Sequence, residues 1–191
     1  MRTRVWPLLL LAALATGCGF NLVIDRDEDV KAAWAEVQNQ YQRRADLVPN
    51  LVSVVRGAAD FEQETLQAVV EARSRVGQVR MDESVLDDPQ RFAEMERAQG
   101  AMSSALSRLL VVAERYPTLT ATQGYRDLQV QLEGTENRIA VARRRFVESV
   151  AAYNKVVLRF PTMIGASLRG KSERPTFTAS EGAEQAPVVE F

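Results

Sequence analysis

A helical spacing of apolar residues is the feature that most restricts how this chain can fold. Between residues 30 and 59, apolar side chains recur at steps of three and four residues. The positions are Val30, Trp34, Val37, Tyr41, Ala45, Val48, Val52, Val55 and Ala59. This spacing places them on one face of an amphipathic α-helix, whereas alternation typical of a strand never lasts more than a few residues. The sequence therefore predicts an all-α fold in which each helix buries one face.

The end of this first helix and the start of a second are marked less sharply. We expect a second helix over about residues 60–79, with Asp60 as its N-cap and Gln63 as its capping-box partner. The apolar spacing also permits the first two helices to form a single long bent rod.

Proline and threonine residues delimit two more helices. The pair Asp88-Pro89 predicts the start of a third helix, because aspartate is a good N-cap and proline suits the first helical position. Pro117 ends that helix. Thr120 or Thr122 then caps a fourth, long helix, which Pro161 stops. Short loops between such helices give an elongated up-and-down antiparallel helical bundle of about four long helices.

The N-terminus carries a segment typical of export. Two arginines precede an apolar run over residues 8–17, which is shorter than the roughly 20 residues that a membrane-spanning helix needs. The run ends in Ala-Thr-Gly-Cys, which resembles a bacterial lipobox, where the cysteine is acylated. Cys18 is the only cysteine and has no partner for a disulfide. We expect residues 1–17 to be a lipoprotein signal peptide and lipid on Cys18 to hold the protein at a membrane. An ordinary cleavable signal that leaves Cys18 as a free thiol is the alternative.

The remaining chain divides into three parts. We expect residues 18–26 to form a lipidated tether, residues 27–168 to form the bundle, and residues 169–191 to form a flexible, disordered tail rich in polar residues. Residues 162–168 are expected to add one helical turn against the bundle. Residue 19 is glycine and not aspartate, so the usual signal for inner-membrane retention is absent. We expect a lipid-anchored protein of the cell envelope, on the periplasmic face of the outer membrane in a host with two membranes and otherwise on the outer face of the plasma membrane.

Composition excludes several classes of function. The chain has no histidine, which removes Ser-His-Asp and Cys-His catalysis and histidine-containing zinc sites. Its formal charge of −1 gives no electrostatic footprint for nucleic acid. The acidic residues at 82, 83, 87 and 88 lack the spacing and the glycine of a calcium loop, so we expect a solvated loop there. We expect no cofactor, no metal and no enzymatic activity; an enzyme that uses carboxylates alone is the least favoured interpretation.

One segment of the first helix is a candidate interaction surface. Its residues are Arg43, Arg44, Asp46, Pro49 and Asn50. Pro49 removes a backbone donor inside the helix, so we expect a kink near residues 45–49 that exposes the carbonyl of Ala45 beside the two guanidinium groups. In the structural alternative, the arginines pair with acidic residues and Pro49 only bends the rod around its core.

Glu136 is a carboxylate at a position where the apolar face of the fourth helix passes. It lies between Leu132 and Ile139 in the sequence. A carboxylate there needs a partner, and Arg43 or Arg44 of the first helix is the natural candidate. The sequence favours a structural buried pair over an active site.

Five segments of the chain resemble the LemA family, in the same order. They are VKAAWAEVQNQYQRRADLVPNLVSVVRGAA at 30–59, EAR at 71–73, LLVVAERYPTL at 109–119, LQVQLEGTENRIAVARRRF at 128–146 and YNKVVLRFP at 153–161. The resemblance implies a long helical bundle on a membrane anchor and implies no reaction. Many family members look anchored by a transmembrane helix, whereas this chain has a lipobox.

Two functions are compatible with these features. The first is a non-enzymatic lipoprotein whose bundle presents a helical surface, around residues 43–50, to an envelope protein partner. The second is a ligand-binding module in which an apolar groove between the first and fourth helices accepts a lipid or a cell-wall fragment.

Overall fold

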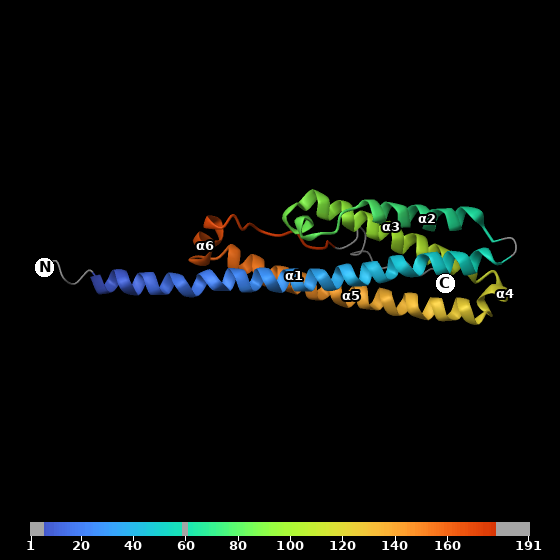
Figure 1. Ribbon diagram of the computed structural model, residues 1–191, viewed down its shortest axis with the longest axis horizontal. Helices are drawn as coiled ribbons and strands as arrows, with labels where there is room; N and C mark the ends of the chain where they lie inside the picture. Colours follow the sequence, from blue (N-terminus) through green and yellow to red (C-terminus); the bar gives the residue numbers. More distant parts are fainter. Residues whose placement is uncertain (1–5, 59–60, 179–191) are drawn as a thin grey trace, which may run out of the picture.

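The computed structural model shows an elongated rod of four long antiparallel helices (Figure 1). It describes the backbone of residues 6–58 and 61–178, and side chains from residue 21 onward within those ranges. The long helices are α1 (Trp6–Arg56), α2 (Gln63–Gln78), α3 (Pro89–Ala113) and α5 (Gln123–Val157). Three short helices connect or follow them: η1 (Glu83–Asp87), α4 (Pro117–Thr120) and α6 (Thr162–Leu168). No strand occurs in the described part of the chain, and the predicted all-α bundle is confirmed.

The predicted start signals of α3 and α5 are confirmed. Asp88 Oδ1 accepts hydrogen bonds from the backbone N–H groups of Gln90 (2.9 Å) and Arg91 (3.2 Å), which have no partner within the helix. Thr122 Oγ1 accepts from the N–H of Tyr125 at 3.3 Å. Pro117 begins the short α4, so its missing N–H falls in a first helical turn.

The connection between the first two helices differs from the prediction. α1 ends at Arg56 and α2 runs back beside it, so the two do not form one bent rod (Figure 1). The N-cap of α2 is Glu62, whose side chain makes no cap hydrogen bond, and the predicted cap Asp60 lies outside the described residues. The expected capping box is therefore wrong, because Gln63 is already the first residue of the helix.

The N-terminal part of α1 also differs from the prediction. The segment expected to be a tether, residues 18–26, belongs to α1. Val23 is buried at 1% exposure and lies two helical turns before Val30, so it extends the same apolar face. The side chain of Cys18 lies outside the described residues. Among the helices that the structure describes, none is both long enough and apolar enough to cross a bilayer.

Residues 169–178 differ from the expected disordered tail. The chain after α6 lies against the bundle, where Arg174 is buried at 5% exposure and Phe177 contacts the rings of Phe92 and Phe146. The composition of residues 169–178 predicted disorder because the segment contains few apolar residues. Composition does not show that Arg174 and Phe177 each contact side chains of the bundle. Residues 179–191 lie outside the described part of the chain.

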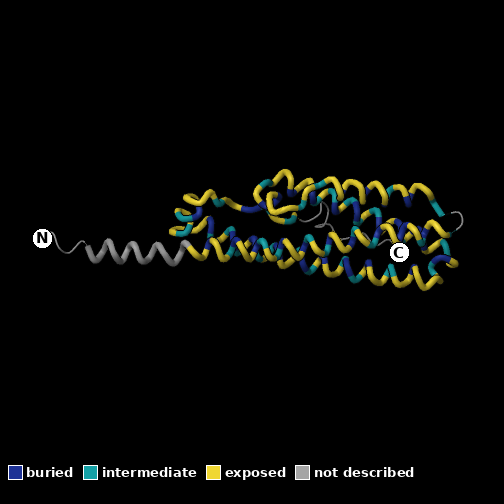
Figure 2. Tube along the Cα trace, viewed as in Figure 1, coloured by how far each residue is buried: buried dark blue, intermediate teal, exposed yellow. Residues whose placement is uncertain are grey.

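Buried side chains form two apolar cores along the rod, on the inward faces of the helices (Figure 2). The proximal core, nearer the N-terminal end of α1, contains Trp34, Phe92 and Phe146. The distal core, toward α4, contains Leu51, Met102 and Tyr125. Polar side chains at 44, 99 and 136 fall between the two cores on α1, α3 and α5. The apolar interior of the rod is therefore interrupted near its middle.

Candidate functional site

Arg44 stands at the centre of this interruption. Its Nη1 donates to Glu136 Oε1 at 2.8 Å and to Ser103 Oγ at 2.6 Å, while Nη2 donates to the Gln99 carbonyl at 3.2 Å and to the Gln99 side-chain oxygen. We call Arg44, Gln99, Ser103 and Glu136 the Arg44 layer. The predicted pair with Glu136 is confirmed for Arg44. Arg43 is not its partner, because helical geometry points residue 43 out of the bundle.

The Arg44 layer also shows what sequence reasoning missed. Gln99 and Ser103 were not singled out, although Gln99 interrupts an apolar series on α3 that includes Met95 and Met102. A polar residue at a buried helical position signals a partner elsewhere in the core. The guanidinium needs several acceptors because an incompletely paired buried charge is costly.

The five predicted surface residues separate into two groups. Arg44 is 1% exposed and faces the core, so for this residue the structural alternative holds. The other four residues are exposed on α1: Arg43, Asp46, Pro49 and Asn50. We call these four residues the α1 face.

Tyr41 lies one helical turn before Arg44, with the Arg44 guanidinium 5.3 Å from its ring centre. Burial raises the pKa of the Tyr41 hydroxyl, and the positive charges of Arg143 and Arg44 partly oppose this effect. In the unfolded chain the Tyr41 hydroxyl has its ordinary pKa of 10.0, and in the folded chain its pKa is higher. The contribution of this hydroxyl to stability is therefore complete below the pKa of the unfolded chain. It is lost as the pH rises from there through the pKa of the folded chain.

We expect the free energy of unfolding to fall less steeply in Tyr41→Phe than in the unmodified protein as the pH rises above about 10. The phenylalanine keeps the buried ring and removes the ionisable hydroxyl. Urea denaturation at a series of pH values measures the two slopes. Equal slopes for both proteins would show that Tyr41 does not ionise on unfolding in this range.

The carbonyl freed by Pro49 has a partner from the neighbouring helix. Proline has no N–H to donate to the carbonyl of Ala45, four residues earlier. Arg73 of α2 supplies the bond instead, with its Nε donating to Ala45 O at 3.3 Å. The sequence predicted a guanidinium at this carbonyl but assigned it to Arg43 or Arg44. Spacing along one helix could not reveal a donor from α2.

We expect Arg73→Ala to lower the free energy of unfolding by about 1 kcal/mol in the unmodified protein and by close to nothing in a Pro49→Ala background. Alanine at position 49 restores the N–H that bonds to Ala45 O, so the carbonyl no longer needs Arg73. A double-mutant cycle by urea denaturation measures this coupling. Arg75→Ala, at an exposed position on the same helix, is the matched control and is expected to have the same effect in both backgrounds. An equal cost of Arg73→Ala in both backgrounds would refute the assignment.

A groove runs between α1 and α2 beside this hydrogen bond. Its volume is about 370 Å3, and we call it the α1–α2 groove. Its walls come from α1, α2 and the chain that follows α2: Tyr41, Gln42, Ala45, Asp46, Arg73, Ser74, Val76, Gly77, Val79 and Met81. Asp46 belongs both to the groove and to the α1 face. The two features therefore form one continuous surface with polar and apolar parts.

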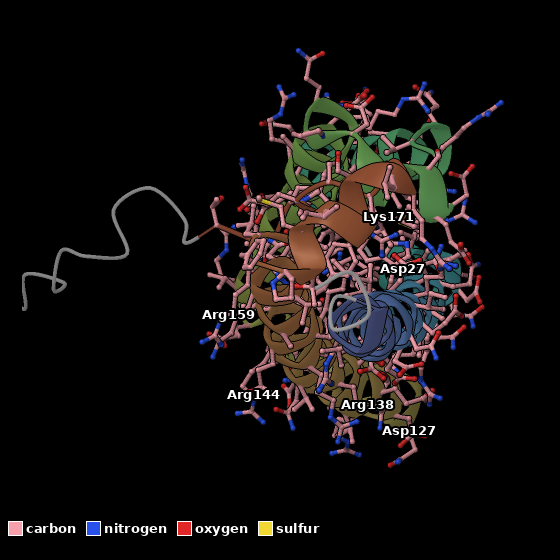
Figure 3. The ribbon with its side chains drawn as sticks, turned by 90° about the vertical axis from the view of Figure 1, so that its left-hand side faces the viewer. Asp27, Asp127, Arg138, Arg144, Arg159 and Lys171 are labelled. Carbon is pink, nitrogen blue, oxygen red and sulfur yellow. The ribbon has the colours of Figure 1, made fainter. Side chains whose placement is uncertain are left out.

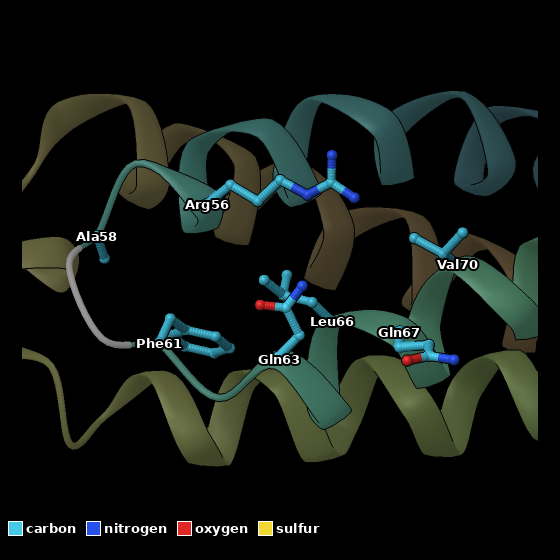
Figure 4. Close-up of a pocket in the computed structure, with 7 residues that line it drawn as sticks. All are labelled: Arg56, Ala58, Phe61, Gln63, Leu66, Gln67 and Val70. Atoms are coloured by element: carbon cyan, nitrogen blue, oxygen red, sulfur yellow. The ribbon is translucent and has the colours of Figure 1, made fainter.

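Further grooves lie elsewhere on the rod, and two of them concern the expected binding modes. One lies near the end of α1 and the start of α2, between Arg56, Phe61 and Leu66 (Figure 4). The other, about 400 Å3, lies between α3 and α5 and is lined by Leu106, Leu110 and Glu136, among others. We expected an apolar groove between the first and fourth helices. In the structure α1 packs along α5, and these two grooves lie between other pairs of helices: α1 and α2 for the first, α3 and α5 for the second.

The acidic residues of the loop after α2 have structural roles. Asp82 caps η1 through the N–H of Ser84, and Asp88 caps α3. A carboxylate oxygen of Asp87 lies 3.7 Å from the guanidinium of Arg174. Within the described residues, no three acidic or cysteine side chains converge as a metal site would require.

Comparison with known sequences relates this chain to one family. A sequence model of the LemA family matches residues 33–191. The chain is 25% identical over 189 residues to the magnetosome protein MamQ of Magnetospirillum gryphiswaldense, covering 89% of this chain and 68% of that protein. It is also 22% identical over 181 residues to protein LemA of Metamycoplasma hominis, covering 91% and 78% of the two chains. Because the family model spans most of the sequence, the resemblance is confirmed and the chain belongs to the LemA family.

Proposed function

We propose that this protein is a non-enzymatic envelope lipoprotein, held at a membrane by lipid on Cys18, whose bundle presents a binding surface to a protein partner. The surface consists of the α1 face and the α1–α2 groove. Its place in the envelope is the periplasmic face of the outer membrane where the host has two membranes.

The observation that carries this proposal is the continuity of α1. The helix runs from Trp6 to Arg56 and leaves the bundle at its N-terminal end (Figure 1). Asp46 lies 28 positions after Cys18 in the same helix, which is a rise of about 42 Å at 1.5 Å per residue. An anchor on Cys18 would therefore hold the α1 face at a fixed distance from the membrane, without a flexible linker.

The α1 face has the mixed chemistry of a protein contact. Arg43 and Asp46 offer opposite charges, Asn50 offers an amide, and Pro49 adds a rigid apolar patch. The nearby Arg44 is fully engaged in the core, so the backbone that displays these side chains is held in place. Prearranged side chains lose less conformational entropy when a partner binds.

The anchor is tested by the intact mass of the protein recovered from host membranes, beside a Cys18→Ala variant. We expect a mass that matches residues 18–191 plus lipid, and we expect the variant to leave the membrane fraction. A full-length, unacylated mass in the membrane fraction would refute the lipoprotein assignment.

The surface is tested by co-purification from crosslinked cells with an Arg43→Ala/Asp46→Ala/Asn50→Ala variant of the full chain. We expect one envelope protein, captured by the unmodified chain, to be lost at an unchanged melting temperature. The matched control is Asp127→Ala/Arg144→Ala, which changes exposed charges on α5 (Figure 3). Equal capture by both variants would exclude the α1 face as the contact.

The groove between α3 and α5 favours a second candidate function. Leu106, Leu110 and Leu132 line it, with Ser103 and Glu136 at its polar side. Such a groove suits an acyl chain or an apolar cell-wall fragment with a polar end. Native mass spectrometry of protein purified from its host tests this candidate, which would be rejected if no small molecule is retained.

A further inference from the structure

Residues 171–178 follow α6 without regular secondary structure and lie against the bundle; we call them the C-terminal strap. Asn154 of α5 holds the strap by its backbone. Its Nδ2 donates to the Arg174 carbonyl at 3.0 Å, and its Oδ1 accepts from the Arg174 N–H at 2.9 Å. A side-chain amide that exchanges two hydrogen bonds with one residue recognises an extended backbone, whatever the side chain.

The Arg174 side chain enters a charged pocket beside this clasp. Its Nη2 lies 2.8 Å from a carboxylate oxygen of Asp27, and its guanidinium lies 5.0 Å from the ring centre of Tyr153. Asp27 is itself buried and also accepts from Lys171 Nζ at 2.9 Å, at the end of the rod shown in Figure 3. The pocket therefore selects a cation by an ion pair and by an aromatic face.

The Phe177 ring enters a second, aromatic pocket. Its ring centre lies 5.0 Å from that of Phe92 and 5.5 Å from that of Phe146. The guanidinium of Arg143 lies 4.1 Å from the Phe177 ring centre, so the ring is covered on a further side. We call Asn154, Asp27, Tyr153 and the Phe92–Phe146–Arg143 pocket the strap seat.

The strap joins the bundle through a hinge. Gly170 has φ of 65°, a conformation that glycine adopts without strain. The N–H of Lys171 bonds to Ala166 O, and the N–H of Gly170 bonds to Ser167 O, both at 3.0 Å. These bonds close the end of α6 in a Schellman arrangement, so α6 is complete before the strap begins. The strap is thus a separate segment whose position depends on the strap seat.

The fit of the strap leaves two donors of the Arg174 guanidinium without hydrogen bonds. Arg174 Nε and Nη1 are buried and make no hydrogen bond to the residues that the structure describes, although Nε lies 3.7 Å from a carboxylate oxygen of Asp87. Buried donors without partners lower the net stability of a contact. A strap held in this way can be displaced by another peptide segment whose side chains enter the same two pockets.

We propose that the strap seat is a peptide-binding site for extended segments with an arginine and, three residues later, an aromatic residue. The strap occupies it within the chain, and a partner protein's segment of the same chemistry replaces the strap. The proposal names a second binding surface, built from residues that the α1 face does not include. A clasp for the backbone and side-chain pockets for specificity are the features by which proteins bind extended peptides.

The test uses full-length protein and a fluorescent peptide with the sequence of residues 170–178. The strap variant Arg174→Ala/Phe177→Ala empties both pockets and leaves the strap seat unchanged. We expect it to bind the peptide at least about 10-fold more tightly than the unmodified chain, because a short tether gives the native strap an effective concentration in the millimolar range. Fluorescence anisotropy measures both affinities.

Two controls define specificity. Adding Asn154→Ala to the strap variant is expected to abolish binding, whereas adding Lys155→Ala, an exposed neighbour on α5, is expected to leave it unchanged. A peptide with alanine in place of its arginine and phenylalanine is expected not to bind. Equal affinity of the strap variant and the unmodified chain, or equal binding of the altered peptide, would overturn the proposal.

A milder variant guards against loss of fold. Phe177→Ser empties only the half-buried aromatic pocket, and we expect an intermediate gain in peptide affinity. Circular dichroism confirms that each variant is folded before it is titrated. No gain in affinity for a folded Phe177→Ser protein would also overturn the proposal.

Discussion

Replacing Arg44 with alanine is expected to lower the free energy of unfolding by about 3–5 kcal/mol, because it removes a large buried side chain and leaves a buried acceptor of Gln99 without its donor. The substitution removes every hydrogen bond of the Arg44 layer that has this guanidinium as donor. The side-chain oxygen of the buried Gln99 loses the Arg44 donor, while Glu136 is partly exposed and can be solvated. Urea denaturation followed by circular dichroism measures the change.

Arg43→Ala is the matched control for this prediction. It removes the same kind of side chain from the adjacent position, which is exposed, and is expected to change stability by less than about 0.5 kcal/mol. Arg44→Lys keeps the charge but cannot reach the acceptors as a planar fork, so an intermediate loss is expected. Similar losses for Arg43→Ala and Arg44→Ala would mean that the layer does not stabilise the fold.

Replacing Trp34 with alanine is expected to cost about 3–5 kcal/mol. Trp34 is fully buried in the proximal core, with ring centres 5.3 Å from Phe146 and 5.9 Å from Phe92. Its Nε1 also donates to Met81 O at 3.1 Å, which fixes the loop after α2 against α1. The substitution therefore leaves a large cavity and removes one of the two side-chain hydrogen bonds to Met81 O, the other of which comes from Gln38.

Trp34→Phe separates these two effects, because it keeps an aromatic ring and removes the indole donor. We expect it to cost distinctly less than Trp34→Ala. Val130→Ala removes apolar atoms at a position that is 68% exposed and is expected to change stability by less than about 0.5 kcal/mol. Circular dichroism is the appropriate probe, since the substitutions change the tryptophan content. A loss below about 1 kcal/mol for Trp34→Ala would contradict the central place of this side chain in the core.

The parts of the fold that the sequence predicted depend on neighbours along the chain. The Asp88 and Thr122 caps act within three residues, and the apolar face of α1 is a repeat of three and four. Glu136 could be assigned a partner, Arg43 or Arg44, because it interrupts an apolar face that must meet another helix; the structure selects Arg44. These signals are local, or they concern which face of a helix is buried.

The parts that the sequence did not predict depend on contacts between distant residues. The strap is held through Asp27 and Lys171, which are separated by 144 positions, and its own composition is that of a disordered tail. The Arg73 bond to Ala45 depends on the register of α2 against α1. Four of the five predicted surface residues are exposed as expected: Arg43, Asp46, Pro49 and Asn50. Arg44 is buried, because adjacent residues of a helix point in different directions and Arg43 takes the exposed one.

The antiparallel contact of α1 with α5 has a mechanical consequence. A force on the N-terminal end of α1, directed along the helix axis, is parallel to this contact. The side-chain contacts between α1 and α5 therefore resist the force together. If α1 slid by one turn, about 5.4 Å, Arg44 would leave Glu136, and Gln40 or Val48 would take its place without a positive charge. The Arg44 layer therefore acts as a stop against sliding, and the rod transmits tension along its length without extending.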